Sequence, residues 1–332
     1  MKKIYILTGS TGHLGNTIVE LLKKEACEIR GLILPSEKEL QTKGITYYKG
    51  DIRNKASLNS LFENTENAEV YVIHSAGIIS LDEEVTPLIY DVNVKGTLNI
   101  IELSLEKKIQ KLVYISSVDA IEADDVDKVI KEVNSFDPDR VAGGYGKTKA
   151  EASQAVLDAT KKGLSAVVVH PSAILGPYDY SGTNKVVNQV KDFIQGKMPA
   201  YVEGTFDFVD VRDVALGCLL AAEKGRSGET YILSNNRYTF NEFLRIIKKA
   251  NKGGKKIPKL PLSMVLRLAP LLERSAAKQG KEPLFTTYSI RKLTGNSRFS
   301  HDKATKELGY IPRDLVDTIK DTVEWLRECN VK

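Results

Sequence analysis

The chain has 332 residues, of which 42% are hydrophobic and 27% are charged, an ordinary composition for a globular protein. This length exceeds that of one average domain, so we expect one large domain with a smaller appended lobe. The net charge of +5 is small, and no dense basic stripe interleaved with aromatic residues occurs. Both observations argue against nucleic acid as the main partner.

Cysteine and histidine are too dispersed to predict a disulfide framework or a metal site. Cys27, Cys218 and Cys329 form no C-x-x-C pair, and His170 and His301 have no companions at ligand spacing. The beginning of the chain lacks the apolar stretch of a signal peptide, and no apolar run is long enough to predict a membrane span. We therefore expect a cytoplasmic protein in a reducing compartment.

The first half of the chain alternates short apolar runs with amphipathic segments. Strands are predicted at Ile4–Leu7, Glu28–Leu34, Thr46–Lys49, Val70–His74, Lys111–Ser116 and Ala166–His170. Helices are predicted at Gly15–Lys24, Ala56–Glu63, Pro87–Lys107 and Gly146–Lys161. Because the strongest strands are apolar without alternation, we expect them to be buried on both faces, as in a parallel sheet covered by helices. The repeated strand–helix order predicts an α/β fold with a doubly wound sheet.

The second half is less regular. Tyr201–Asp213 and Thr230–Ser234 are predicted as later strands that return to the sheet. We therefore assign residues 1–178 and about 201–235 to the large domain, and about 179–200 and 236–332 to a smaller, mostly helical lobe that binds substrate. No linker separates the two parts, so we expect them to fold as one unit around a cleft.

A glycine-rich turn lies between the first predicted strand and the first predicted helix, with the sequence Thr8-Gly9-Ser10-Thr11-Gly12-His13-Leu14-Gly15. Gly9 permits a tight turn, Gly12 lets the backbone approach a pyrophosphate, and Gly15 lets the helix and strand pack closely. The free N–H groups at the positive end of the helix would bind phosphate. This context predicts a dinucleotide-binding (Rossmann) domain, rather than glycines that serve packing alone.

Tyr145 and Lys149 are four residues apart in a predicted helix, so their side chains share one face. A tyrosine of pKa about 10 acts as an acid or base near neutral pH only if a nearby cation stabilises its phenolate. A lysine ammonium on the same face supplies that cation. The pair predicts a proton donor for a carbonyl reduction, or a base for the reverse reaction. The alternative is a packed tyrosine beside a solvated lysine.

Together the glycine turn and the Tyr-x-x-x-Lys pair resemble the extended short-chain dehydrogenase/reductases of the NAD-dependent epimerase/dehydratase family, over nearly the whole chain. Further segments match the family in its order: Gly50-Asp51-Ile52, His74-Ser75-Ala76-Gly77, Asn93-Val94-Lys95-Gly96-Thr97 and His170-Pro171-Ser172-Ala173-Ile174-Leu175-Gly176-Pro177. The resemblance implies the following cofactor contacts: Asp51 and Ile52 at the adenine, Ser75, Ala76 and Gly77 beside the cofactor, and Pro171, Ser172 and Ile174 at the nicotinamide.

The resemblance also implies further roles. It favours Ser117 as the catalytic hydroxyl and Ser116 as its structural neighbour, at the end of a strand where open α/β sheets hold ligands. Asn93 is expected either to hold a strand carbonyl or a water in a proton relay, or only to satisfy the backbone at a helix bend. A homodimer is implied, through the helices at about Pro87–Lys107 and Gly146–Lys161.

The cofactor preference depends on the end of the second strand. An acid there bonds the ribose hydroxyls of NAD, but Leu34 occupies the expected position. Ser36, Lys38 and His13 are the groups that could meet a 2′-phosphate. We therefore expect NADP(H) by a modest margin, while Glu37 leaves NAD(H) open.

For the substrate, Phe206 stands where nucleotide-sugar epimerases and dehydratases usually carry an arginine that grips a diphosphate. The segments Leu308–Arg313 and Asp321–Leu326 also resemble the dihydroflavonol-reductase and 3β-hydroxysteroid-dehydrogenase side of the family. The sequence thus favours an oxidoreductase that transfers a hydride between nicotinamide and a carbonyl or hydroxyl of a small, largely apolar molecule. A nucleotide-sugar epimerase or dehydratase is the alternative. A non-catalytic NAD(P)-binding regulatory protein is less favoured, because the catalytic pair is retained.

Three other features have two interpretations each. The acidic insertion Asp119–Asp139 is either a lid over the pocket, with Gly143-Gly144 as its hinge, or a solvated loop. The lysine-rich stretch before the apolar segment Leu260–Leu272 is more often a solvated loop than a surface for anionic membranes. The charged residues near the late strand are interpreted as a structural ion-pair set that ties the lobes, rather than as catalytic groups: Asp207, Asp210, Arg212 and Asp213.

Overall fold

The computed structural model describes residues 1–37, 43–123, 128–267, 269, 293 and 295–330. Its centre is a seven-stranded sheet in the order β10-β6-β5-β4-β1-β2-β3, in which every neighbouring pair is parallel. The strands are β1 (Lys2–Thr8), β2 (Glu28–Ile33), β3 (Thr46–Lys49), β4 (Ala68–His74), β5 (Lys111–Ile115), β6 (Ala166–Pro171) and β10 (Thr230–Leu233). The strand order reverses between β1 and β4, which confirms the predicted doubly wound α/β fold.

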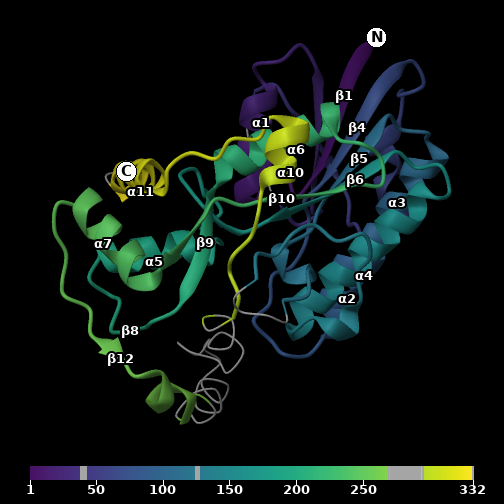
Figure 1. The fold of residues 1–332 in the computed structure, drawn as a ribbon. Coiled ribbons are helices and arrows are strands. Elements are labelled where there is room, and N and C mark those ends of the chain that lie inside the picture. Colours follow the sequence, from purple (N-terminus) through teal and green to yellow (C-terminus); the bar gives the residue numbers. More distant parts are fainter. Residues whose placement is uncertain (38–42, 124–127, 268, 270–292, 294, 331–332) are drawn as a thin grey trace.

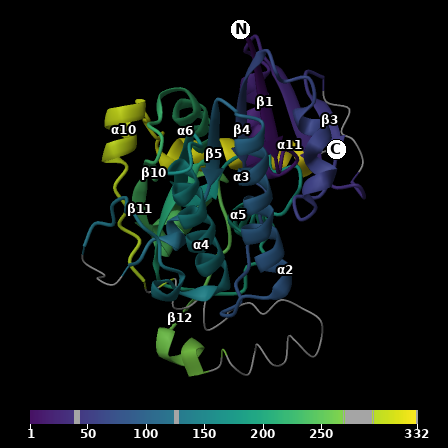
Figure 2. The same ribbon diagram turned by 90° about the vertical axis from the view of Figure 1, so that its right-hand side faces the viewer.

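Helices cover both faces of this sheet (Figures 1 and 2). On one face, η1 (Lys55–Phe62), α3 (Gly96–Glu106) and α4 (Gly143–Thr160) pack on one apolar core, whereas α1 (His13–Leu22) and α6 (Val211–Lys224) pack on a second core across the sheet. Neighbouring strand residues divide between the two cores: Ile4 and Ile6 face one, Tyr5 and Leu7 the other. This alternation explains why the strands are apolar throughout.

The predicted helix Pro87–Lys107 is a composite of three pieces. It consists of α2 (Pro87–Tyr90), a π-helical turn η2 (Asp91–Lys95) and α3. Such π-helical turns are rare in proteins overall, but where they occur they often lie at functional sites. The turn contains Asn93, one of the residues that the family resemblance selects.

The small lobe has its own sheets and core. A three-stranded sheet in the order β11-β9-β7 contains β7 (Ala173–Leu175), β9 (Thr205–Asp210) and β11 (Asn236–Thr239), and β8 (Tyr201–Val202) pairs with β12 (Lys259–Leu260). Around them pack α5 (Lys185–Ile194), α7 (Phe240–Ala250) and α11 (Leu315–Asn330). The prediction that Tyr201–Asp213 returns to the large sheet is therefore wrong, and of the described later strands only β10 does so. The assignment of residues 1–178 to the large domain is also wrong at its end, because β7 pairs with β9 in the sheet of the small lobe.

The last part of the described chain crosses between the two parts. Helix α10 (Asp302–Leu308) packs against α6 and β10, although we assigned it to the small lobe, whereas α11 packs against α5 and α7 (Figure 1). The physical reason is apolar burial: Ala304 and Leu308 complete the core on the α6 side of the large sheet. The two parts thus share one continuous C-terminal segment.

Charged residues at the start of α6 reinforce this crossing, as predicted for Asp210, Arg212 and Asp213. The inclusion of Asp207 in this ion-pair set is wrong, because within the described residues its carboxylate accepts hydrogen bonds from the uncharged Ser172 hydroxyl and Asn235 N–H. Arg212 forms ion pairs with Asp210 and with Asp321 of α11, both at 2.7 Å. The carboxylate of Asp213 accepts hydrogen bonds from the guanidinium and the backbone N–H of Arg313. Asp210 and Asp213 are almost fully buried, so these pairs serve the junction of the two parts.

The described helices include none that is long and apolar enough to span a bilayer. The lysines between α7 and β12 are exposed, as either interpretation of that stretch requires. After β12, a helical segment over residues 262–267 exposes Met264 and Leu266. Residues 268 and 270–272 of the apolar segment Leu260–Leu272 lie outside the described residues.

Candidate active site

The glycine turn joins β1 to α1 with the geometry that its sequence predicts. Gly9 has φ +69°, and a Cβ on it would lie 2.8 Å from the N atom of Ala76. A Cβ on Gly15 would lie only 2.0 Å from the carbonyl oxygen of Gly9. Both positions therefore need glycine for the protein's own packing. Ser10 is buried, and its hydroxyl donates to the carbonyl of Leu32 in β2 rather than facing a ligand.

Gly12 differs from the other two glycines. It is the N-cap residue of α1, with φ −73°, and because glycine has no side chain it leaves the first N–H groups of the helix without a side-chain cap from this position. A Cβ on it would meet only the carbonyl oxygen of Gly9, at 3.4 Å. The protein itself therefore does not require glycine here, and the space beside the open helix end fits the close approach of a pyrophosphate.

The carboxyl end of β4 is bound to the carboxyl end of β1. The hydroxyl of Ser75 donates to the carbonyl of Thr8 at 2.9 Å, and the backbone N–H of Ala76 donates to the hydroxyl of Thr8 at 3.2 Å. Between these strands, Thr8 Oγ1 lies 2.6 Å from Nδ1 of the buried His74, and His74 Nε2 lies 3.0 Å from Thr97 Oγ1. Burial lowers the pKa of His74 to about 3, so the ring is neutral.

Asn93 supports the segment that follows β4. Its side-chain oxygen accepts from the N–H of Ile78 at 2.8 Å, and its amide nitrogen donates to the carbonyl of Ile78 at 3.0 Å and to Thr148 Oγ1 at 3.1 Å. Asn93 thus holds a backbone carbonyl, as in the first of its two expected roles, although Ile78 follows β4 and does not lie within it. A Cβ on Gly77 would lie 3.2 Å from Asn93 Oδ1 and 3.5 Å from Lys149 Nζ, so these groups meet at Gly77.

Lys149 is buried on α4, with 4% of its surface exposed. Its ammonium donates to the carbonyl of Ile115 at 2.7 Å and lies 4.8 Å from the centre of the Tyr114 ring. Because burial disfavours the charged form, the pKa of Lys149 falls to about 7. Tyr145, in the first turn of α4, is also buried, and it lies close enough to contribute, after burial itself, to the raised pKa of Tyr114.

The two serines after β5 differ in their surroundings. Ser116 is buried, and its hydroxyl lies 2.7 Å from that of Ser153 on α4, which fits a structural role. Ser117 is only partly buried, and its hydroxyl accepts from the N–H of Asp119. Its carbonyl accepts from Nδ1 of His170 at 3.0 Å. A hydroxyl that is acceptor in this contact keeps its own proton for another partner.

The remaining cofactor candidates lie at or just after the carboxyl ends of β2, β3 and β6, and in β7. Leu34 and Ser36 are exposed beyond β2, and Lys38 lies outside the described residues. The Asp51 carboxylate is paired with Arg53, which lowers its pKa, and Ile52 is buried against Gly96. Pro171 ends β6 and Ile174 lies in β7, while the hydroxyl of Ser172 donates to Asp207 at 2.5 Å.

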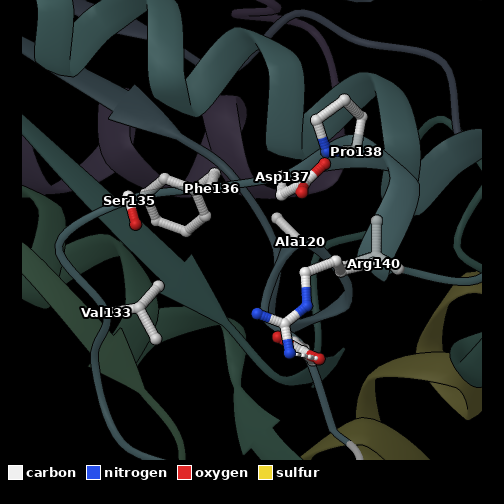
Figure 3. Close-up of a pocket in the computed structure, with 9 residues that line it drawn as sticks. Ala120, Val133, Ser135, Phe136, Asp137, Pro138 and Arg140 are labelled. Carbon is white, nitrogen blue, oxygen red and sulfur yellow. Dashed lines mark ion pairs between the residues drawn. The ribbon is translucent and has the colours of Figure 1, made fainter.

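A pocket of about 530 Å³ lies inside the insertion between Ser117 and Tyr145 (Figure 3). Its lining consists of Ala120, Glu122, Val133, Ser135, Phe136, Asp137, Pro138, Arg140 and Val141. Figure 3 shows Phe136 and Val133 on one side and Pro138 and Arg140 on the other. Phe136 stacks on His170 with ring centres 5.1 Å apart, and His170 in turn contacts the Ser117 carbonyl. The His170 ring therefore connects Phe136, in the wall of the pocket, to Ser117.

The described part of the insertion is held against the sheet edge. The Glu132 carboxylate accepts from the N–H of Ile232 in β10, and the carbonyl of Val133 accepts from Thr230 Oγ1. The proposed hinge is also packed, because a Cβ on Gly144 would lie 2.3 Å from the carbonyl oxygen of Glu84. Gly144 is therefore needed for close packing, which argues against the hinge interpretation. Residues 124–127 of the insertion lie outside the described residues.

Sequence reasoning missed the role of the His13 ring. We listed it among groups that could meet a 2′-phosphate, but both ring nitrogens contact the small lobe: Nε2 lies 2.8 Å from the carbonyl of Pro177, and Nδ1 lies 2.9 Å from the amide nitrogen of Asn184. It also missed Asn184, Thr148 and Thr97. Asn184 carries only the local signal of a helix N-cap.

With this geometry in view, the fold and site define a dinucleotide-binding protein with the tyrosine–lysine arrangement of the extended short-chain dehydrogenase/reductases. The sequence profile of the NAD dependent epimerase/dehydratase family matches residues 5–234. The chain therefore belongs to the NAD-dependent epimerase/dehydratase family.

Several named proteins are similar to this chain over most of its length. The "Sterol demethylase protein B" of Methylococcus capsulatus is 29% identical, with 97% of this chain and 98% of that protein covered. The 4-hydroxy-2-methyl-3-oxo-4-farnesyl-3,4-dihydroquinoline-1-oxide ketoreductase of Stigmatella aurantiaca is 28% identical, with 92% and 91% covered. The structure of a UDP-glucose 4-epimerase from Thermotoga maritima superposes with a TM-score of 0.79 at 21% identity, over 98% and 99% of the two chains. At that identity the likeness shows the fold.

The glycine geometry yields a paired prediction. Gly15→Ala should destabilise the protein by about 3 kcal/mol or more, because its Cβ overlaps a backbone oxygen. Gly12→Ala should change stability by less than about 1 kcal/mol, yet weaken NADH binding about tenfold or more, because its Cβ occupies the approach of the pyrophosphate. Urea unfolding and fluorescence titration measure the two effects. Normal NADH affinity in folded Gly12→Ala protein would contradict this placement of the pyrophosphate.

The buried ammonium yields a second prediction. The folded protein has a Lys149 pKa of about 7 against an ordinary value of 10.5, so the unfolded chain binds more protons between these values. The cost of burying Lys149 is therefore full below about pH 7 and fades as the pH rises toward 10. Lys149→Met should stabilise the fold by about 1–3 kcal/mol at pH 6.5 and by less at pH 9.5.

Urea unfolding at both pH values measures this difference. The control is Lys161→Met, which removes an exposed lysine directly after α4 and should change stability by less than about 0.5 kcal/mol. A Lys149→Met protein that is less stable than the wild type at pH 6.5 would show that burial of the ammonium is compensated.

Proposed function

We propose that this protein is an NAD(H)-dependent oxidoreductase that reduces a carbonyl group, or oxidises the corresponding hydroxyl group, on a small and largely apolar molecule. The observation that carries the proposal is the burial of Lys149 and Tyr145 four residues apart on α4, with the Lys149 ammonium beside Gly77 in a segment that is hydrogen-bonded to Thr8 at the start of the glycine turn. A buried ammonium is costly and is retained where chemistry needs it.

In the proposed reaction, the hydroxyl of Tyr145 gives its proton to the substrate oxygen, and the ammonium of Lys149 stabilises the phenolate that remains. The hydroxyl of Ser117 donates a hydrogen bond to the same oxygen as charge develops on it. A nicotinamide, when bound, supplies or accepts the hydride at the substrate carbon. Asn93 keeps the segment after β4 in place by its bonds to Ile78, and so acts as a positioning residue.

An apolar substrate is supported by the small lobe. Phe206 replaces the arginine that nucleotide-sugar enzymes use at this point of the late strand, and its ring packs in an aromatic cluster with Phe208 and Phe240. That cluster offers no cation for a diphosphate. The names of two relatives, a sterol demethylase protein and a ketoreductase acting on a farnesyl-substituted compound, point in the same direction. The nucleotide-sugar epimerase remains the second candidate, because the family includes such enzymes.

The sequence favoured NADP(H) by a modest margin, but the structure supports NAD(H). Both nitrogens of His13 are bonded to the protein, which removes one of the groups that could meet a 2′-phosphate. The carboxylate of Glu37 folds back to accept from the N–H of Leu34 at 3.2 Å. An acid therefore reaches the end of β2 from three residues further along the chain, where it can bond ribose hydroxyls and repel a 2′-phosphate.

Tyr145→Phe tests the proton donor. We expect turnover to fall about 10²–10⁴-fold while NADH affinity stays within about twofold, because only the hydroxyl is removed. The assay offers apolar ketones and aldehydes beside UDP-sugars and follows absorbance at the reduced nicotinamide band. Net NADH oxidation with the carbonyl compounds supports a reductase, whereas epimerised sugar without net oxidation supports the second candidate. Full activity of Tyr145→Phe would exclude this tyrosine as the donor.

Glu37→Gln tests the cofactor preference. A hydrogen bond to a charged group contributes about 1.5–3 kcal/mol, so the ratio of NADH to NADPH affinity should fall by about tenfold or more. Glu20→Gln, an exposed substitution on α1, should leave that ratio unchanged. Tighter binding of NADPH than NADH by the wild-type protein would overturn the proposal for Glu37.

A further inference from the structure

The side chain of His13 connects the glycine turn to the small lobe. His13 is the first residue of α1, its ring is buried with 7% exposed, and its two nitrogens contact Pro177 and Asn184 across more than 160 residues of sequence. Because a carbonyl only accepts hydrogen bonds, Nε2 carries the proton and donates to Pro177. Nδ1 then accepts from the Asn184 amide, so the ring is neutral. Burial lowers the pKa of His13, which favours the same state.

Asn184 uses its whole side chain to hold this junction. Its oxygen accepts from the N–H groups of Val186 and Val187, at 2.9 and 3.1 Å, and so caps α5. Its nitrogen donates to His13 Nδ1 and to the carbonyl of Ile174 in β7, at 2.9 and 3.0 Å. A primary amide can make four such bonds, and Asn184 makes all four. One side chain therefore fixes the start of α5, β7 and the glycine turn relative to one another.

The segment between these contacts has an unusual backbone. Tyr178 has φ +75°, a left-handed conformation that tyrosine rarely adopts. Its neighbour Pro177 is held by His13, and the buried Asp179 accepts from the backbone N–H of Asn184 at 2.9 Å. A conformation of this kind persists only where surrounding contacts hold it in place. The bonds to His13 and Asn184 are such contacts.

We propose that His13 and Asn184 are positioning residues that couple occupancy of the dinucleotide site to the order of segment 174–187 of the small lobe. The backbone of His13 belongs to the helix end that receives the pyrophosphate, while its ring holds the lobe. A ligand that fixes the turn also fixes the ring, so part of the entropy cost of ordering segment 174–187 is already met when substrate arrives. The inference rests on the cofactor site of the proposed function, and not on the reaction catalysed there.

Hydrogen exchange of segment 174–187, measured with and without NADH, tests the coupling. NADH should slow this exchange in the wild-type protein, and His13→Phe and Asn184→Ala should each remove most of that response while NADH still binds. Their NADH dissociation constants should rise about 5–10-fold, in the range of typical coupling energies. Because the two residues form one link, the double variant should weaken NADH binding no further than the stronger single variant.

Asn188→Ala is the matched control. Asn188 also lies in α5 and its amide donates to the carbonyl of Gly182 at 2.9 Å, but within the described residues it forms no hydrogen bond with the glycine turn. This variant should keep both the exchange response and the NADH affinity. Equal losses in Asn188→Ala and Asn184→Ala would mean that any loosening of α5 has the same effect, and would overturn the specific link.

Asn184→Asp gives a readout that a purely structural role would not move. A carboxylate cannot donate to His13 Nδ1, and a neutral ring has only one N–H, so only a protonated His13 can donate both to the introduced carboxylate and to the carbonyl of Pro177. The groups facing this ring from neighbouring elements are Asp179, before α5, and Asp210, at the end of β9, and both favour the protonated form. The exchange response of Asn184→Asp should therefore return as the pH falls from about 8 to 5.5, whereas the wild-type response stays constant.

Two outcomes would contradict the proposed coupling. Wild-type segment 174–187 that exchanges equally with and without NADH, although NADH is bound, would show that the two sites are independent. A full response in His13→Phe would show that the ring is not the link. Absence of reductase activity leaves both measurements interpretable, because neither one depends on turnover.

Discussion

The site depends on how the carboxyl ends of β1 and β4 are held together. Strand order reverses at this pair, so the chain leaves β1 toward one face of the sheet and leaves β4 toward the other. Buried hydrogen bonds from Thr8 to His74 and from His74 to Thr97 cross the gap, and Thr97 in turn donates to the carbonyl of Asn93 at 2.7 Å. The glycine turn, the π-helical turn and the segment with Gly77 are thereby fixed in one frame.

Within that frame the protein maintains a cation that folding alone would not favour. The ammonium of Lys149 has a backbone carbonyl and an aromatic face as its neighbours, and the described residues give it no carboxylate in an ion pair. His74 and His170 are buried nearby and neutral, and Lys149 is among the causes that lower the pKa of each. Of these three buried basic side chains, the two histidines are thus neutral, and the positive charge lies on Lys149, where the proposed chemistry uses it.

The sequence predicted the large domain well because its information is local. Apolar runs identify buried parallel strands, and a glycine turn between a strand and a helix identifies a phosphate site. The late strand was misassigned because Phe206-Asp207-Phe208-Val209-Asp210 fits a strand of either sheet, and only pairing partners decide between them. Helix α10 was misassigned for a related reason: periodicity shows that Ala304 and Leu308 are buried, but not against which core.

The site was predictable to the same degree. The tyrosine, the lysine and the glycines are readable from spacing, whereas the contact of His13 with Asn184 joins residues 171 positions apart and leaves no local pattern. The proposed role of Glu37 was equally hard to predict. An acid three residues beyond the usual position can reach the ribose only because the turn after β2 folds back, and the sequence does not show that turn.

The insertion attached to β10 covers part of an edge of the large sheet. β10 is one of the two edge strands of the large sheet, and an edge strand with free N–H and C=O groups invites another chain to pair with it. The Glu132 carboxylate accepts the N–H of Ile232, and the described insertion runs along this edge. The described insertion therefore covers part of this edge, so that shortening it would expose the N–H and C=O groups of β10 to pairing with another chain.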